Sequence, residues 1–363
     1  MTSLVRPNIL YIEANASCQL KCPTCPTTSQ GYPPVIGSGY LRRKDLKTLL
    51  EKNPQIKNVH LENRGELFLN PELLQIMQCG FKKNILIYAD GGVNLNNVRE
   101  GVLEGLVKYK FQSLCCSIDG ATPETYQIYR VGGDFKRVIK HIQVINKFKQ
   151  KYKSKYPELT WQFVVFGHNE HEIPLAREMA NELNMSFKPK MSWDSEYSPI
   201  RNIEFVMEQT GWPAATREKY EKVTKKNYAR RTCYSLWTSP RINWDGKVLG
   251  CCWNSWADFG GNAFENGYIP AINNDKIIYA KNMLLGRVDP LKGLPCTTCD
   301  LYKMMKNSGR YLSENEIFDR HSLLYRGARF LYRFVPGLRY LGKKNYSVIS
   351  QCREILSKHN AGL

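Results

Sequence analysis

Short apolar segments alternate with segments of helical spacing along residues 9–191. The predicted strands are residues 9–14, 56–61, 85–89, 114–119, 161–166 and 185–191. The predicted helices between them are residues 44–51, 71–79, 98–108, 135–149 and 173–183. Strands that alternate with helices in this way pair in parallel and are covered by those helices. The pattern therefore predicts an α/β fold, and by itself it leaves open whether the sheet forms a partial barrel or an open doubly wound sheet.

Three cysteines, Cys18, Cys22 and Cys25, follow the first predicted strand with the spacing C-x3-C-x2-C. Parallel sheets place their chemistry at the carboxyl ends of their strands. Three thiolates at this spacing can bind one [4Fe-4S] cluster and leave its fourth iron open. Structural zinc is the alternative, but zinc knuckles favour paired C-x2-C units with a fourth ligand close by, and the next cysteine is Cys79.

The composition is that of a globular protein of 363 residues, long enough for one large or two modest domains. Its hydrophobic fraction is 42%, and no segment approaches the roughly 18 uncharged apolar residues of a membrane-spanning helix. The N-terminus does not have the pattern of a signal peptide. We therefore expect a cytoplasmic protein in which many of the 12 cysteines ligate metal rather than form disulfides.

Basic residues outnumber acidic ones, with 52 Lys and Arg against 33 Asp and Glu, which gives a net charge of +19. Such a field favours an anionic partner, such as a phosphate, a nucleotide sugar, a nucleic acid or a membrane surface. The tail at residues 311–363 is basic and amphipathic. It is typical of a segment that docks on the protein's own surface, and contact with a membrane surface or with an anionic substrate is the alternative.

Polar residues recur at or after the ends of the later predicted strands. The segments are ENRGE at 62–66, YADGG at 88–92, SIDG at 117–120 and RVGG at 130–133. Because side chains alternate between the faces of a strand, Cys115, Ser117 and Asp119 lie on one face of the fourth strand. Polar side chains on a buried strand need partners, so this face is expected to line a ligand site.

Together with the cysteine triplet, these segments resemble the radical S-adenosylmethionine (radical SAM) superfamily. The resemblance implies a partial (β/α)6 barrel, in which the open iron binds the amino and carboxylate groups of SAM. The chain departs from the family at Thr24, where an aromatic residue is usual, at Arg64, where a glycine is common, and at Asp90, which replaces an asparagine.

The resemblance also implies a role in SAM binding for each motif. The Glu66 carboxylate would pair with the SAM ammonium, the Arg130 guanidinium would bind the SAM carboxylate, and the SIDG strand would contact the ribose. The alternatives are a helix N-terminal charge for Glu66 and an interhelical salt bridge for Arg130. The implied cofactor-binding residues are Gly65, Glu66, Ser117, Asp119, Arg130 and Asn169.

A second group of cysteines follows a basic stretch that contains prolines. An Asp245-Gly246 pair between apolar runs predicts a hairpin. The cysteines around it form a four-thiolate set, for which structural zinc and an iron–sulfur cluster are the alternatives. Behind a radical SAM core, their order resembles the Twitch, or shortened SPASM, extension, which holds an auxiliary [4Fe-4S] cluster. The implied ligands are Cys233, Cys251, Cys296 and Cys299, which leaves Cys252 free.

The chain is thus expected to divide into four parts. They are a radical SAM core at 1–205, a linker helix at 206–232, a Twitch or SPASM-like domain at 233–310 and the basic tail at 311–363.

The resemblance implies reductive cleavage of SAM to a 5′-deoxyadenosyl radical that abstracts hydrogen from a substrate. It implies two [4Fe-4S] clusters, SAM and an electron donor of the flavodoxin or ferredoxin type. Peptide-modifying relatives often carry a leader-binding domain ahead of the core, and the first strand begins near residue 8. We therefore expect a hydroxylated, anionic small molecule, such as a sugar, nucleotide sugar or aminocyclitol, which is epimerised or dehydrogenated.

Two alternatives stay open, namely radical modification of a ribosomal peptide and modification of RNA. No RNA-binding appendage is recognisable, which argues against RNA. Epimerisation requires a hydrogen donor on the opposite face of the substrate, and a weak S–H bond can supply it. The candidate thiols are Cys252, beside a predicted cluster ligand, and Cys115 as reserve.

Overall fold

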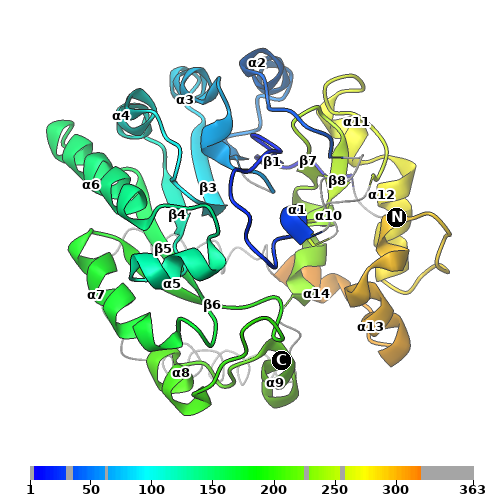
Figure 1. The fold of residues 1–363 in the computed structure, drawn as a ribbon. Helices are drawn as coiled ribbons and strands as arrows, with labels where there is room; N and C mark the ends of the chain where they lie inside the picture. The colour runs from blue at the N-terminus through cyan, green and yellow to red at the C-terminus, as the bar shows by residue number, and fades with distance from the viewer. Residues whose placement is uncertain (1–3, 30–35, 62–63, 225–228, 254–257, 320–363) are drawn as a thin grey trace, which may run out of the picture. The chain divides into compact units, whose positions relative to one another are not determined.

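The computed structural model describes residues 4–29, 36–61, 64–224, 229–253 and 258–319 (Figure 1). Residues 1–309 form one compact unit, and residues 310–363 form a second. Of the second unit only residues 310–319 are described, and they include helix α14 (Glu314–Asp319). Most of the predicted basic tail, residues 320–363, lies outside the described residues.

The first unit is built on one sheet of eight strands in the order β6-β5-β4-β3-β2-β1-β7-β8. The strands are β1 (Ile9–Ile12), β2 (Asn58–Leu61), β3 (Leu86–Val93), β4 (Ser113–Ser117), β5 (Glu158–Val165), β6 (Ser186–Met191), β7 (Arg241–Ile242) and β8 (Val248–Gly250). Strands β1 to β6 pair in parallel with their neighbours. The edge strands β6 and β8 are not paired with each other in the described sheet, so the sheet does not close into a full barrel, as expected for the predicted α/β partial barrel.

Helices cover the outer side of this sheet, as Figure 1 shows for α2, α3, α4, α6 and α7. Their bounds are α2 (Arg43–Lys52), α3 (Leu73–Lys82), α4 (Glu100–Lys108), α6 (Phe135–Lys151) and α7 (Ile173–Glu182). In α6 the buried residues Phe135, Val138, Ile142 and Ile145 recur every three or four positions, which is the spacing of one helix face. That face packs toward the sheet, and Asp134 caps the helix by accepting from the Arg137 N–H at 3.0 Å.

The remaining helices are short or follow the sixth strand. They are α1 (Pro26–Ser29), α5 (Pro123–Tyr129), α8 (Ile203–Thr210), α9 (Arg217–Thr224), α10 (Ser235–Thr238), α11 (Tyr268–Ile272), α12 (Asp275–Leu284) and α13 (Asp300–Ser308). No helix among the described residues is long and apolar enough to cross a membrane.

Alternation along the strands separates an apolar outer face from a polar inner face. Leu10 and Ile12 of β1 are fully buried, whereas Tyr11 between them points to the other side. The Tyr11 ring stacks on His60 of β2 at 4.4 Å between centroids, and His60 stacks on Tyr88 of β3 at 4.7 Å. The inside of the partial barrel is therefore lined by aromatic and polar side chains.

The cysteine-rich segment is joined to the same sheet. Strand β7 pairs in parallel with β1, through Ile12 and Ile242, and antiparallel with β8. The turn between β7 and β8 contains Gly246 at φ 93°, a backbone conformation that favours glycine. The predicted hairpin at Asp245-Gly246 is confirmed.

The largest error in a predicted strand boundary is at the end of the third strand. The apolar pattern predicts that the third strand ends at residue 89 and that the chain turns at 88–92, but β3 continues through an irregularity to Val93. Asp90 therefore lies within the strand, where its carboxylate is 3.6 Å from His60 Nδ1. Gly92 sustains the irregularity at φ 119°, and a Cβ there would lie 2.4 Å from Ser117 Oγ.

Candidate cofactor site at the carboxyl ends of the strands

The loop after β1 brings the first three cysteines into one packed cluster. Cys22 is buried with Leu20, Tyr129 and Phe166, and the partly buried Cys18 and Cys25 pack against the same cluster. Helix α5 supplies Tyr129, and the end of β5 leads to Phe166. The structure thus brings together the three side chains that the C-x3-C-x2-C spacing predicted.

Tyr129 explains how the chain accommodates Thr24 in place of an aromatic residue. The hydroxyls of Thr24 and Tyr129 are 2.8 Å apart, and the Tyr129 ring lies 4.5 Å from that of Phe166. The aromatic shielding of the thiols therefore comes from α5 and β5 rather than from the cysteine loop itself.

Two side-chain N–H groups donate to the thiols. Arg130 Nη1 donates to Cys22 Sγ at 3.6 Å, and Asn94 Nδ2 donates to Cys18 Sγ at 3.7 Å. Burial, followed by the charges of Glu66 and the neighbouring thiols, raises the pKa of Cys18 to about 11. The Cys18 thiol is thus costly to ionise unless positive charge is placed beside it.

Gly65 and Glu66 pack directly on the cysteine loop. The Glu66 N–H donates to the Ser17 carbonyl at 2.8 Å. A Cβ on Gly65 would lie 1.8 Å from the Asn15 carbonyl oxygen, so a side chain cannot be accommodated there. The sequence motif predicts a glycine that lets the backbone approach a ligand, but the backbone that Gly65 approaches in the structure is that of the cysteine loop.

Glu66 is 2% exposed and accepts from the chain through both carboxylate oxygens. The N–H of Asn94 donates to Oε2 at 2.8 Å, and the N–H of Phe68 donates to Oε1 at 3.3 Å. Burial is the main cause that raises the pKa of Glu66 to about 7, against the lowering effect of these N–H groups and of Arg130. The carboxyl group is held near Cys18, where it also raises the pKa of that thiol.

Asn94 is a site residue that the sequence motifs did not reveal. It follows β3 directly and joins three features, because it contacts Cys18, Glu66 and Gln19. The sequence motif ends the third strand near Asp90, because the irregularity that extends β3 to Val93 is not predictable from the apolar pattern. The sequence does contain a signal for the later strand end, because polar asparagines first alternate with apolar residues in Val-Asn-Leu-Asn at 93–96.

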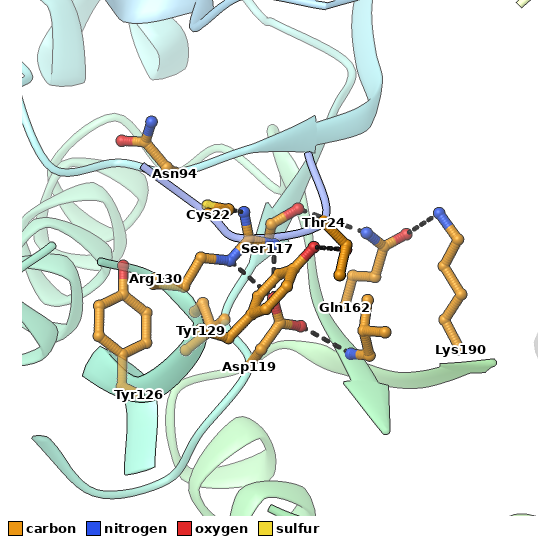
Figure 2. A network of polar contacts seen from close by, with 12 residues as sticks. Cys22, Thr24, Asn94, Ser117, Asp119, Tyr126, Tyr129, Arg130, Gln162 and Lys190 are labelled. Atoms are coloured by element: carbon orange, nitrogen blue, oxygen red, sulfur yellow. Dashed lines mark hydrogen bonds and ion pairs between the residues drawn. The ribbon is translucent and has the colours of Figure 1, made fainter. Parts of the chain in front are cut away.

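Asp119 and Arg130 form a buried ion pair, which Figure 2 shows at the centre of the polar network. Arg130 Nε and Nη2 each lie 2.6 Å from Asp119 Oδ2, and the Val164 N–H donates to Oδ1 at 2.6 Å. The pair is a contact within the core of the site rather than the interhelical salt bridge considered from the sequence. It fixes the guanidinium beside Cys22.

A second branch of the network crosses the barrel interior (Figure 2). Gln162 Nε2 of β5 donates to Ser117 Oγ of β4 at 3.3 Å, and Lys190 Nζ of β6 donates to Gln162 Oε1 at 3.4 Å. The thiol of Cys115 lies within electrostatic range of Lys190. Ser117 and Cys115 therefore face the interior together, as the alternation along the strand predicted.

Asn169 is fully buried and is engaged by backbone groups. Its Nδ2 donates to the carbonyls of Asp119 at 3.1 Å and Val164 at 2.9 Å, and its Oδ1 accepts from the Phe166 N–H at 2.8 Å. These bonds tie the end of β4 to the end of β5. Direct contact between Asn169 and SAM stays a prediction.

Glu13, directly after β1, is another buried carboxyl group that the motifs did not reveal. It accepts from the N–H of Arg64 at 2.8 Å and from the N–H of Gly65 at 3.3 Å. Burial raises its pKa to about 7, against the lowering effect of those two N–H groups. Glu13 thus holds Arg64 and Gly65 to the end of β1, and only its place next to the first strand could have suggested this.

The later cysteines divide into buried thiols and one exposed thiol. Cys233, Cys251 and Cys296 are buried, whereas Cys252 is exposed. Burial and then the charges of Cys251 and Cys299 raise the pKa of Cys296, so these three thiols lie within electrostatic range of one another. Of the adjacent pair, Cys251 is thus the one that lies with the C-x2-C unit.

No three His, Cys, Asp or Glu side chains in the described ranges are placed to hold a single metal ion. A [4Fe-4S] cluster makes a different demand, since each thiolate binds its own iron and the sulfurs are spread around the cluster. The N–H donors of Arg130 and Asn94 also suit it, because hydrogen bonds to cluster sulfurs are one way in which a protein tunes the cluster. The residues present therefore fit such a cluster.

No family model and no curated protein matches the chain. Solved structures do match it. SuiB from Streptococcus suis bound to S-adenosylmethionine has a TM-score of 0.55 at 16% identity, over 82% of this chain and 71% of that chain. SuiB bound to the precursor peptide SuiA has a TM-score of 0.55 at 15% identity, over 83% of this chain and 71% of that chain. Histidine-tagged anSMEcpe with bound AdoMet has a TM-score of 0.54 at 16% identity, over 92% of this chain and 97% of that chain.

The chain has the radical SAM fold. In that fold the first three cysteines follow β1, Glu66 follows β2, Asn94 follows β3, Asp119 follows β4 and Asn169 follows β5. The α/β partial barrel expected from the sequence is confirmed.

Proposed function

We propose that the chain is a radical SAM enzyme whose first cluster is held by Cys18, Cys22 and Cys25. The observation that carries the proposal is the packing of these three cysteines on one loop after β1, with Arg130 and Asn94 donating to their sulfurs. The similar fold of enzymes solved with bound S-adenosylmethionine supports it. When bound, the cluster would supply the electron that cleaves SAM to methionine and a 5′-deoxyadenosyl radical.

The residues around the cysteines would bind and orient SAM. The Glu66 carboxylate is the group for the SAM ammonium, and its pKa of about 7 would fall when that cation binds beside it. Ser117 and Asp119 are the proposed ribose contacts, with Gly65 and Asn169 holding the loops on either side. Arg130 is already paired with Asp119, so it would bind the SAM carboxylate with the N–H groups that this pair leaves.

The later cysteines would hold an auxiliary [4Fe-4S] cluster of the Twitch or SPASM type. Burial of Cys233 and the mutual proximity of the other three thiols support this set. The proposed ligands are Cys233, Cys251, Cys296 and Cys299. A flavodoxin or ferredoxin in the cytoplasm would supply electrons.

For the substrate we propose a hydroxylated, anionic small molecule of the sugar, nucleotide sugar or aminocyclitol class, which is epimerised or dehydrogenated. The polar barrel interior and the net charge of +19 support this class. In an epimerisation, the substrate carbon loses hydrogen from one face and receives hydrogen from a thiol on the other. The thiyl sulfur left behind must then take up one electron, from the flavodoxin or ferredoxin, and one proton.

Cys252 is the proposed hydrogen donor, with Cys115 as the alternative. Arg64 Nη2 donates to the Cys252 carbonyl at 2.8 Å, and Arg64 lies within electrostatic range of the thiols of both Cys252 and Cys25. Arg64 thus lies between the exposed Cys252 thiol and the first cysteine loop. Cys115 is buried on the inner face of β4.

The iron content tests the two-cluster proposal. Anaerobically reconstituted protein should bind about eight irons, and replacing Cys18, Cys22 and Cys25 by alanine should remove about half of them together with all SAM cleavage. An unchanged iron content in this variant would refute the first site. Zinc in place of the second four irons would refute the auxiliary cluster.

Solvent deuterium separates the two reactions. Incubation in deuterated water with SAM, dithionite and a cell extract of the host should yield a product that carries one deuterium at unchanged oxidation state. Cys252→Ala should then stop product formation while 5′-deoxyadenosine still forms. A product two hydrogens lighter and free of deuterium would establish dehydrogenation instead.

A peptide substrate is the second candidate, because SuiB with SuiA and anSMEcpe with peptide Kp18Cys are among the similar structures. The same mass spectrometry distinguishes it, since the deuterium or mass change would then appear in a peptide. Modification of RNA would instead require RNA binding that weakens steeply as salt is raised.

A further inference from the structure

Strand β6 directs two lysines toward the barrel interior. Phe187 packs against Phe163 at 5.9 Å between ring centroids and against Arg177 of α7, on the helix-covered side, so the alternate residues Lys188 and Lys190 face the other side. The bond from Lys190 to Gln162 at 3.4 Å places that ammonium in the interior network. Lys188 is exposed and Lys190 is half-buried.

An arginine joins these lysines beyond the end of the strand. The Arg217 guanidinium lies 3.2 Å from the centroid of the Trp193 ring, and its Nη2 donates to the Met191 carbonyl at 2.9 Å. Lys190 Nζ is 5.9 Å from the centroid of the same ring. Two cations therefore converge on Trp193, and the stacking holds the guanidinium in a fixed orientation.

Trp193 also links the two edges of the open sheet. It follows β6, and its ring lies 4.5 Å from that of Trp253, in a T-shaped contact, shortly after β8. Trp253 is the neighbour of Cys252, the proposed hydrogen donor. The contact thus brings the residue on which the two cations converge next to the segment that carries that thiol. Trp193 remains 53% exposed.

Three acidic side chains of this region have partners other than the two lysines. Asp119 is paired with Arg130, Glu218 is 2.7 Å from Lys222 Nζ, and Asp194 accepts from backbone N–H groups. Neither Lys188 nor Lys190 forms an ion pair with any residue that the structure describes. Burial, followed by the charges of Lys188 and Arg217, lowers the pKa of Lys190. An anion bound among the three would relieve this repulsion.

We propose that Lys190, Lys188 and Arg217 form the subsite that binds the anionic group of the substrate, with Trp193 as its wall. The inference rests on the proposed function for the existence of a substrate, and it deepens that function by naming the side chains that select an anion. The anionic group is a phosphate or a carboxylate, since both accept N–H bonds from lysine and arginine. The remainder of the substrate would then extend toward Ser117 and the cysteine loop.

Equilibrium dialysis of the reconstituted protein tests the subsite without turnover. Radiolabelled inorganic phosphate and radiolabelled acetate are the probes, at constant ionic strength and with SAM present but no reductant, so that SAM occupies its own site. We expect saturable binding of at least one probe, and Lys190→Gln should weaken it at least about tenfold through the loss of a charge-assisted contact. Tighter binding of phosphate would indicate that the anionic group of the substrate is a phosphate, and tighter binding of acetate would indicate a carboxylate.

Two matched variants control for folding and for net charge. Lys190→Arg keeps the charge and should retain binding, whereas Lys82→Gln removes an exposed charge from α3 and should bind as the wild type does. Equal affinity of the wild type and Lys190→Gln would overturn the proposal. So would the absence of saturable binding of both probes to the wild type.

The proposed function can fail separately. Dithionite is added to the same preparations, and formation of 5′-deoxyadenosine is measured. If SAM is cleaved but phosphate and acetate bind independently of Lys190, the subsite is wrong and the proposed function stands. If binding depends on Lys190 but SAM is not cleaved, the proposed function is wrong and the anion subsite stands.

Discussion

The Asp119–Arg130 pair offers the sharpest test of how the site is held together. Asp119 is fully buried, and the side chain of Arg130 is 14% exposed. Both Nε and Nη2 of the guanidinium bind the same carboxylate oxygen at 2.6 Å, while the other oxygen has the Val164 N–H. Replacing Arg130 by methionine keeps most of the side-chain volume but leaves a buried carboxylate without its counter-charge.

The expected cost follows from burial. Breaking a buried ion pair by removing one partner typically costs about 3–5 kcal/mol, because the charge that remains has lost its compensation. Removing both partners in Asp119→Asn/Arg130→Met should recover most of this loss, since no buried charge is then left. An exposed pair provides the comparison: Arg137 and Asp134 are 3.5 Å apart with half-exposed side chains, and Arg137→Met should cost less than about 1 kcal/mol.

Urea denaturation of the cluster-free protein measures these differences without a contribution from bound iron. The free energies of unfolding of the wild type, both single variants and the double variant form a double-mutant cycle. If Arg130→Met costs no more than Arg137→Met, the buried pair does not have the energetic role assigned to it. If the free energy of unfolding lost in the double variant equals the sum of the losses in the two single variants, Asp119 and Arg130 are not coupled, which would likewise contradict the reasoning.

Three further predictions concern the ENRGE segment and its supports. Glu66→Gln should weaken SAM binding by about 1.5–3 kcal/mol, at least tenfold, with unchanged iron content; equal SAM affinity would disprove its role. Because folding raises the pKa of Glu13 from 4.5 to about 7, its stabilising effect is present below pH 4.5 and is lost as pH rises through 7. The stability of the wild type should thus fall relative to Glu13→Gln by on the order of 3 kcal/mol between pH 5 and 8, and parallel pH profiles would contradict this. Gly65→Ala should lower the unfolding temperature, because its Cβ would overlap the Asn15 carbonyl, whereas Gly101→Ala, with open space around it, should raise it.

The sequence by itself determined the order and type of the main elements. Strand and helix periodicities depend on residues near one another in the chain, so β1 to β6 and the covering helices could be located from local pattern alone. The cysteine spacing could be recognised for the same reason, because Cys18, Cys22 and Cys25 lie on one loop. The Asp245-Gly246 hairpin is likewise a local signal.

The partners of the site residues were decided by the tertiary structure. Glu13 binds the segment that begins at Arg64, and Gly65 is required by the backbone of Asn15, a contact between loops about fifty residues apart. Asn94 reaches Cys18 only because β3 continues past its predicted end. Such contacts depend on strand register and on the exact path of each loop, which side-chain alternation does not specify.

The anion subsite shows the same division. The sequence contains a large excess of positive charge, but charge alone does not distinguish a solvated face from a binding site. The structure brings Lys190, Arg217 and Trp193 together after β6, and sets Trp253 against them from beyond β8. Because β6 and β8 are opposite edges of one curved sheet, only the curvature of the folded sheet could make these residues neighbours.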